Sequence, residues 1–310
     1  MTRIDFRPDG ARKNYTSYGG GMRNAPSILF ALPALLIFIG FSVIPVIGVV
    51  LMSFTSWQGL GAITFTGITS WKTALSDPLT SNAIVITVKI MVLSFSIQAP
   101  LSLLLGVFLA GRQKYREVLG ILYFVPMLLS SAAIAVLFRA FFDPNFGIGA
   151  FSNLPIFKAN LLGSKLAIYT VTIVIAWQFI PFHTLIYQGG VRQIPQSIFE
   201  AAKIDGANRW QEFWYITLPQ LKHTAITSTT LMIVGSLTYF DLVFVMTKGG
   251  PGVATRMLPL HMYITGFQAN QMGVAAALGV MLLIVGFILA LITQRLGGKD
   301  RSESQTEGAL

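Results

Sequence analysis

The chain has 310 residues, of which 54% are hydrophobic and only 11% are charged, whereas soluble domains carry about 25% charged residues. This composition excludes a soluble globular protein and indicates an integral membrane protein. The net charge of +10 does not indicate nucleic acid as a partner, because Lys and Arg accumulate in the cytoplasmic loops of membrane proteins. The absence of cysteine excludes disulfides, thiolate metal sites and cysteine nucleophiles.

Long apolar runs predict an all-α, polytopic membrane protein with six transmembrane helices. Each run is long enough to cross about 30 Å of hydrocarbon at 1.5 Å per residue. Prolines inside the runs are compatible with membrane helices, because neighbouring helices can satisfy the freed backbone groups. The first run is too long for the apolar region of a signal peptide, so we expect a retained helix. The predicted helices cover residues 27–50, 83–110, 118–142, 166–190, 224–246 and 272–293.

The positions of Lys and Arg predict that both termini are cytoplasmic. Most of the 22 basic residues fall in the two tails, in the connection between helices two and three, and in that between helices four and five, which the positive-inside rule places in the cytoplasm. We expect disordered tails at 1–26 and 296–310, because they are polar and Gly-rich. Between them, residues 27–295 form the predicted six-helix domain.

One cytoplasmic segment, 195–219, combines charged and apolar residues. Its sequence "PQSIFEAAKIDGANRWQEFWYITLP" has helical periodicity, which places Phe199, Ala202, Gly206, Trp210 and Phe213 on one face. Glycine inside a helix is unfavourable, so a break or bend is expected at its centre. Acidic and basic residues balance, whereas helices that lie passively on a membrane are strongly cationic. The pattern therefore favours docking onto another protein over docking onto lipid.

This segment resembles the EAA motif of the membrane subunits of binding-protein-dependent ABC importers. The match to EAA-x-x-DGA-x-x-x-x-x-F-x-x-I-x-LP is complete. Downstream, "TYFDLVFVMTKGGPGVATRMLPLHMYITGF" resembles the GGP-containing outer loop of carbohydrate permeases of the maltose and glycerol-phosphate type. Gly249, Gly250 and Pro251 would lie in this outer-mouth loop, where a binding protein docks.

The resemblance implies an ABC importer permease fold in a bacterial or archaeal inner membrane. The EAA segment would be a coupling helix seated in an ATPase subunit. ATP-driven closure of the ATPase would then switch the permease between its inward-facing and outward-facing states. Implied partners are a second permease in a heterodimer, two ATPase subunits and an extracytoplasmic solute-binding protein. The implied ATPase-coupling residues are Glu200, Ala201, Ala202, Asp205, Gly206 and Ala207.

The energy source is expected outside the chain. No G-x-x-x-x-G-K-[ST] loop is present to hold nucleotide phosphates, so ATP and Mg²⁺ would be bound by the partner ATPase. The three histidines are dispersed and no G-x-S-x-G turn occurs, so neither a metal site nor a catalytic residue is expected. The chain is predicted to be a non-catalytic subunit.

Few ionisable residues fall inside the predicted helices. Lys89 either reaches the outer headgroups with its long side chain, which we slightly favour, or pairs with Asp241 at the outer mouth. His183 is expected to be a hydrogen-bonded interior residue. An ion-coupled carrier would instead place several ionisable groups at mid-membrane depth.

Candidate substrate residues combine aromatic faces with hydrogen-bonding groups, as sugar binding requires. Two stretches, "AWQFIPFH" and "GSLTYFD", match in position the family segments that line the sugar site, although ordinary helix packing explains each residue about as well. The resulting candidates are Trp177, Gln178, Phe179, Phe182, Ser236 and Tyr239.

The predicted function is the permease subunit of an ATP-driven carbohydrate importer. One alternative is an ion-coupled secondary carrier or channel, which would need no ATPase and would be insensitive to changes at Glu200. The other is an ABC permease for glycerol phosphate or another non-sugar solute. The absence of an arginine at mid-membrane depth weakly favours a neutral sugar.

Overall fold

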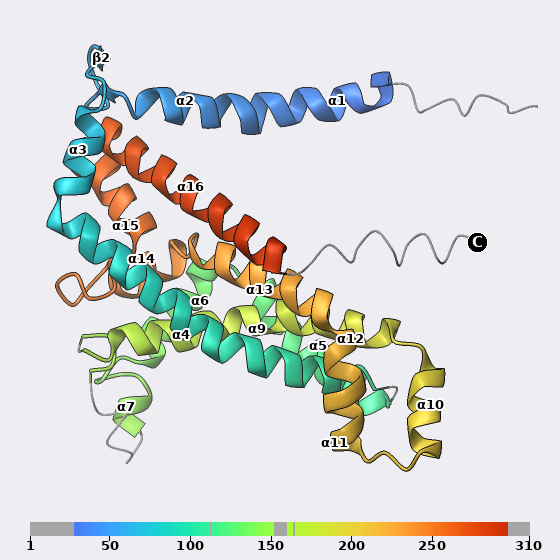
Figure 1. Ribbon diagram of the computed structural model, residues 1–310. Helices are drawn as coiled ribbons and strands as arrows, with labels where there is room; N and C mark the ends of the chain where they lie inside the picture. The colour runs from blue at the N-terminus through green and yellow to red at the C-terminus, as the bar shows by residue number, and fades with distance from the viewer. Residues whose placement is uncertain (1–27, 112, 152–159, 164, 297–310) are drawn as a thin grey trace, which may run out of the picture. The chain divides into compact units, whose positions relative to one another are not determined.

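The computed structural model describes residues 28–111, 113–151, 160–163 and 165–296 (Figure 1). It divides into two units, Met1–Ile47 and Gly48–Leu310, which are described separately. The tails predicted at 1–26 and 296–310 lie outside the described residues, apart from Leu296, which ends the last helix.

The described residues of the first unit form an apolar helix with one widened turn. Helix α1 (Ile28–Phe38) continues through the π-helical turn η1 (Ile39–Val43) into α2 (Ile44–Met52), whose last residues belong to the second unit. The widened turn directly precedes Pro45, whose missing N–H interrupts the regular hydrogen-bond ladder. The 22 residues from Ala31 to Met52 are long and apolar enough to cross a membrane.

Three further continuous helices of the second unit are long enough to span a membrane. The first of them starts at Asp77, whose side chain accepts a hydrogen bond from the Leu79 N–H at 2.9 Å, and Pro78 occupies the first turn, where no intrahelical N–H is needed. These helices are α4 (Pro78–Leu109), α9 (Ala167–Gln193) and α16 (Met272–Leu296).

The third and fifth predicted spans are not single helices. Residues 118–142 were expected to form one helix, but α5 (Lys114–Leu128) and α6 (Ser131–Phe141) meet at 94°, because Leu129 and Ser130 have extended backbones. Residues 224–246 likewise divide into α13 (Lys222–Ser236) and α14 (Asp241–Thr247), which meet at 46°. Within the described part of the chain there are four continuous candidate spans, or six if each bent pair crosses once.

The remaining elements are short. A two-stranded antiparallel hairpin pairs Thr55 with Phe65 and Ser56 with Thr64. The short elements are β1 (Thr55–Ser56), β2 (Thr64–Phe65), α3 (Thr69–Ser76), α7 (Ile148–Phe151), α10 (Gln196–Ile204), α11 (Arg209–Gln211), η2 (Glu212–Thr217), α12 (Leu218–Gln220), α15 (Leu258–Tyr263) and η3 (Ile264–Gln268).

The core of the second unit lies where α4, α6, α9, α14 and α15 meet. Ile90, Ile134, Val174, Val243 and Leu260 are buried together there. Helices α4 and α9 approach closely at Gly106, where an added Cβ would lie 2.5 Å from the Cβ of Tyr187. Close backbone approach at small residues is how membrane helices pack without a hydrophobic driving force.

Candidate functional site

The predicted coupling segment forms a helical hairpin at one end of the second unit (Figure 1). Helix α10 ends at Ile204, and Gly206, just after its C-cap residue Asp205, has a left-handed φ of 79°. Two hydrogen bonds close this end, from the Gly206 N–H to the Lys203 carbonyl at 3.1 Å and from the Ala207 N–H to the Ala202 carbonyl at 2.9 Å. This is the Schellman arrangement, in which glycine supplies the left-handed residue.

The second arm of the hairpin begins with a complete capping box. The Asn208 side chain accepts a hydrogen bond from the Gln211 N–H at 3.0 Å, and the Gln211 side chain accepts one from the Asn208 N–H at 2.8 Å. Each side chain satisfies a backbone N–H that the helix leaves unpaired. The sequence therefore encodes both the turn and the restart of the helix within six residues, 206–211.

The hairpin presents carboxylates beside an exposed apolar side chain. Glu200, Ala201 and Asp205 are exposed, Ala207 is half-buried, and Ala202 is buried against the hairpin. Ile204 is 87% exposed and adds an apolar side chain to this charged surface. The surface is thus suited to docking on another protein.

The single apolar face predicted for this segment is wrong at Trp210. Phe199 and Phe213 are half-buried and Ala202 is buried, but Trp210 is 73% exposed. The prediction treated the segment as one continuous helix, in which these residues share a face. The turn at Gly206 interrupts the helix, so positions before and after it no longer share a face.

The outer-mouth loop is held by a buried threonine. Helix α14 ends at Lys248, which has a left-handed φ of 52°, and Gly249 follows at 89°; the Gly250–Pro251 peptide is cis. The Thr255 hydroxyl, which is fully buried, lies 2.7 Å from the Thr247 hydroxyl and 2.9 Å from the Gly250 carbonyl. Thr255 was not among the predicted residues, although it follows the loop directly.

The predicted substrate residues fall into separate environments. Phe179 and Tyr239 stack with ring centroids 5.2 Å apart. Gln178 is buried and donates to the Ser131 hydroxyl at 2.9 Å, while Trp177 packs edge-on against Phe138.

The two remaining candidates interact with residues close to them in the sequence. Phe182 contacts the ring of its neighbour His183, and the Ser236 hydroxyl donates to the Ile233 carbonyl of its own helix at 2.6 Å. Of the six predicted residues, Phe179 and Tyr239 come from separate helical segments and are brought together as a stacked pair.

Three buried polar residues of α4, Ser94, Gln98 and Ser102, share one helix face, and Gln98 lies beside the Phe179–Tyr239 pair. The Gln98 side chain donates to the Ser94 hydroxyl and lies 3.5 Å from the Tyr239 hydroxyl. Ser94, Gln98 and Ser102 are all buried. Their spacing of four residues within an apolar helix places them on one face, and this signal in the sequence could have identified Gln98.

The alternative considered for Lys89, a pair with Asp241, is not present among the described residues. Both residues are exposed, and no ion pair joins them among the described residues. That the Lys89 side chain reaches the outer headgroups stays a prediction. His183 is buried, with its Nδ1 atom 3.0 Å from the Ser228 hydroxyl, as expected for an interior histidine.

A second buried histidine, His261 on α15, lies beside the start of α4. The Nε2 atom of His261 is 3.0 Å from the Thr80 hydroxyl and 3.5 Å from Oδ2 of Asp77. Burial lowers the pKa of His261 from its usual value, the positive charge of Arg256 lowers it further, and Asp77 opposes both. No group of three or more His, Asp or Glu side chains in the described ranges is placed to hold a metal ion.

Comparison with known proteins identifies the region that carries these features. Residues 102–299 match the family described as the binding-protein-dependent transport system inner membrane component. The match includes both arms of the hairpin and the outer-mouth loop.

Curated relatives cover almost the whole chain. The probable ABC transporter permease protein PH1215 of Pyrococcus horikoshii is 32% identical over 87% of this chain and 96% of its own length. The arabinooligosaccharides transport system permease protein AraP of Bacillus subtilis is 29% identical over 91% of both chains. The fold resembles a chain in the crystal structure of a bacterial ABC transporter that imports alginate, with a TM-score of 0.77, 21% identity, and coverage of 89% of this chain and 96% of that one.

Proposed function

Because this chain belongs to the family of binding-protein-dependent transport system inner membrane components, we propose that it is a permease subunit of an ATP-driven importer whose substrate is a carbohydrate. The family places the chain in the membrane as a multi-pass, non-catalytic permease, with ATP hydrolysis in a separate ATPase and solute delivery by a binding protein. We infer a heterodimer with a second permease in a bacterial or archaeal inner membrane, and ATP and Mg²⁺ bound by two partner ATPase subunits.

The observation that carries the coupling role is the α10–α11 hairpin. Glu200 and Asp205 are exposed on it next to Ile204, and the Schellman turn and capping box fix the shape of the hairpin. A rigid element with exposed carboxylates and an apolar anchor is suited to transmit movement from a docked subunit, because apolar burial provides affinity and charge pairing sets the register. Glu200 would pair with a basic residue of the ATPase, and the small Ala201 would permit close backbone approach.

Carbohydrate as substrate is supported by the arabinooligosaccharide permease among the relatives. It is also supported by the Phe179–Tyr239 stack, which the polar side chain of Gln98 joins. Aromatic surface with a few placed hydrogen-bonding groups is the composition of a small-molecule site. These three side chains would contribute to the wall of the transport path.

The first test is co-purification. The tagged full-length chain is purified from its native membrane in mild detergent, and its partners are identified by mass spectrometry. We expect an ATPase subunit that is lost from the Glu200→Gln, Asp205→Asn double variant. The matched control is Glu117→Gln, which removes an exposed carboxylate from the first turn of α5. Recovery of the chain alone and still competent for transport would favour an ion-coupled carrier.

The substrate class is tested on the complete importer. The binding protein that co-purifies or is encoded with the chain is screened for binding of neutral oligosaccharides, uronate oligosaccharides and glycerol phosphate. We expect oligosaccharide binding, followed by ATP-dependent uptake of the same sugar into vesicles. Binding of glycerol phosphate alone would contradict the carbohydrate assignment and leave the importer assignment intact.

A further inference from the structure

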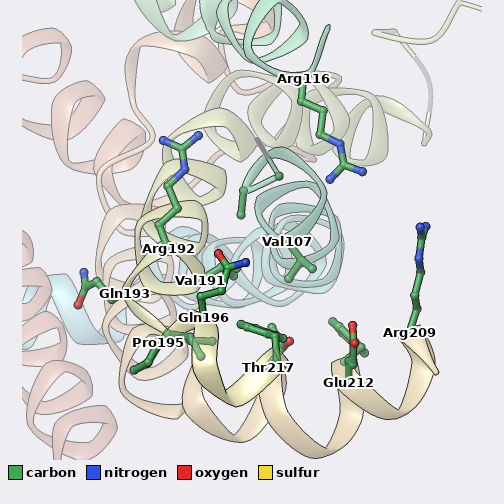
Figure 2. A pocket seen from close by; sticks show the side chains of 15 residues that line it. Val107, Arg116, Val191, Arg192, Gln193, Pro195, Gln196, Arg209, Glu212 and Thr217 are labelled. Atoms are coloured by element: carbon green, nitrogen blue, oxygen red, sulfur yellow. The ribbon is translucent and has the colours of Figure 1, made fainter. Parts of the chain in front are cut away.

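A cavity of about 860 Å³ lies between the hairpin and the helix ends above it. Its lining comes from the last turns of α4 and α9, the first turn of α5, and both arms of the hairpin. Figure 2 shows Arg116, Arg192 and Arg209 around this space, with Glu212 on the hairpin arm below it. The cavity is separate from the exposed carboxylates of the predicted coupling residues.

The charge of the lining is positive. Arg192 and Arg209 are exposed, and among the described residues their guanidinium groups make neither a hydrogen bond nor an ion pair. Arg116 donates to the Phe108 carbonyl and stacks over the Phe108 ring at 4.5 Å, which holds its guanidinium at the rim. Glu212 is the one carboxylate that lines the cavity in the described residues, so three positive charges face one negative charge.

The interior of the cavity is apolar. Val107, Ala110, Val191, Ile194, Phe199 and Phe213 line it. A free inorganic anion would gain nothing from such a wall, and a nucleic acid would find no stacked aromatic platform. An amphiphile that joins a negative charge to an aliphatic chain matches both parts of the lining.

The position of the cavity matches the depth of the lipid headgroups. It lies where the candidate spans Pro78–Leu109 and Ala167–Gln193 end and where Lys114–Leu128 begins. This is the side on which Lys and Arg gather, which the positive-inside rule places in the cytoplasm. Basic pockets between membrane helices on this side bind anionic headgroups.

We propose that this cavity binds the headgroup of one anionic phospholipid of the inner leaflet. Arg192 and Arg209 contact the phosphate from α9 and α11, Arg116 contributes from the rim, and the first acyl carbons lie against the apolar wall. Because the lining belongs both to the membrane helices and to the hairpin, the bound lipid braces the hairpin against the membrane domain. The site needs only the membrane position of the chain, so it does not depend on which solute is transported.

The test uses the complete transporter with its partner subunits. Purified complex in detergent is titrated with phosphatidylglycerol or with phosphatidylcholine, and bound lipid is counted by native mass spectrometry. We expect retention of one phosphatidylglycerol in preference to phosphatidylcholine. Arg192→Gln and Arg209→Gln should each weaken the binding of phosphatidylglycerol about five-fold, since each basic residue near an anionic surface contributes about that factor to affinity.

Two further variants make the result independent of folding defects. Glu212→Gln removes the one carboxylate of the lining and should strengthen phosphatidylglycerol binding about five-fold. Arg295→Gln removes an exposed arginine from the last turn of α16, outside the cavity, and should leave lipid binding unchanged.

Four outcomes would overturn the proposal. Equal retention of the two lipids would show that the cavity does not select an anionic headgroup. A loss of phosphatidylglycerol from Arg295→Gln as large as that from the cavity variants would show general attraction to the protein surface. Displacement of phosphatidylglycerol by an equal concentration of inorganic phosphate would identify a free-anion site. A cross-link from Arg192→Cys to the ATPase subunit that persists at saturating phosphatidylglycerol would assign the cavity to that subunit.

Discussion

The rings of Phe179 on α9 and Tyr239, in the turn between α13 and α14, stack with centroids 5.2 Å apart and planes inclined by 29°. Residues 60 positions apart in sequence thus form one aromatic surface. The Tyr239 hydroxyl lies 3.5 Å from Gln98, so one edge of this surface is polar. The pair also joins the continuous helix α9 to the bend of the fifth span.

Tyr239→Phe is expected to separate transport from stability. The substitution keeps the stacked ring and removes only the hydroxyl, so we expect unchanged assembly and melting temperature but a several-fold loss of ATP-dependent sugar uptake in vesicles. Phe179→Leu, which removes the stack, should lower the melting temperature instead, because an aromatic pair contributes about 0.5–1.5 kcal/mol beyond its area. Unchanged uptake by Tyr239→Phe would place this hydroxyl outside the transport path.

Gly206→Ala should weaken attachment of the ATPase through the backbone alone. A Cβ at Gly206 meets no atom within 4 Å, but φ is +79°, a conformation that costs an ordinary residue about 1–2 kcal/mol. We expect less ATPase subunit in the purified complex. Gly206→Asn is the matched comparison, because asparagine adopts left-handed backbone more readily. Equal recovery of the ATPase from both variants and wild type would show that the turn is not needed for docking.

Gly106→Ala should destabilise the crossing of α4 and α9. The new Cβ would lie 2.5 Å from the Tyr187 Cβ and 3.0 Å from the Thr184 carbonyl oxygen, and overpacking of this kind costs about 1–3 kcal/mol. We expect a lower melting temperature of the purified complex. Gly189→Ala adds the same methyl group to α9 where no atom lies within 4 Å, and should change little. Similar melting temperatures for the two variants would mean that the helices separate without cost.

His261 should make the stability of the folded chain depend on pH. Burial lowers its pKa in the folded chain below the value of about 6.5 in an unfolded chain. The unfolded state therefore binds more protons below about pH 6.5, so stability falls as the pH is lowered through this value. We expect the melting temperature of wild type to drop more steeply between pH 7.5 and 5 than that of His261→Gln. Parallel curves would show that protonation of His261 does not oppose folding.

Much of the coupling hairpin follows from local sequence. Gly206 favours a helix end, Asn208 and Gln211 together favour a helix start, and the predicted break occurs at Gly206. The exposure of Trp210 was not predicted, because helical periodicity was extended across that break. The proposed coupling roles of Glu200 and its neighbours remain predictions.

The contacts of the candidate substrate residues were harder to predict, because they are made between helices. Phe179 and Tyr239 were both chosen, but their stacking, and the approach of Gln98 and Ser131 from α4 and α6, depend on helix rotation and crossing. The same limit applies to Lys89 and Asp241, whose similar depth suggested a pair that the helix positions do not form.

The sequence by itself determined the membrane location, the approximate spans, the turn in the hairpin and the resemblance to importer permeases. These properties depend on composition and on interactions within a few residues, since a lipid-exposed segment must satisfy its backbone internally. Only the tertiary structure decided the 94° and 46° bends, the polar network that Gln98 forms with Tyr239, and the arginine-lined cavity. Each of these depends on how separate helices pack. Many arrangements of apolar helices bury similar surface, so small residues and a few polar contacts between helices determine which arrangement forms.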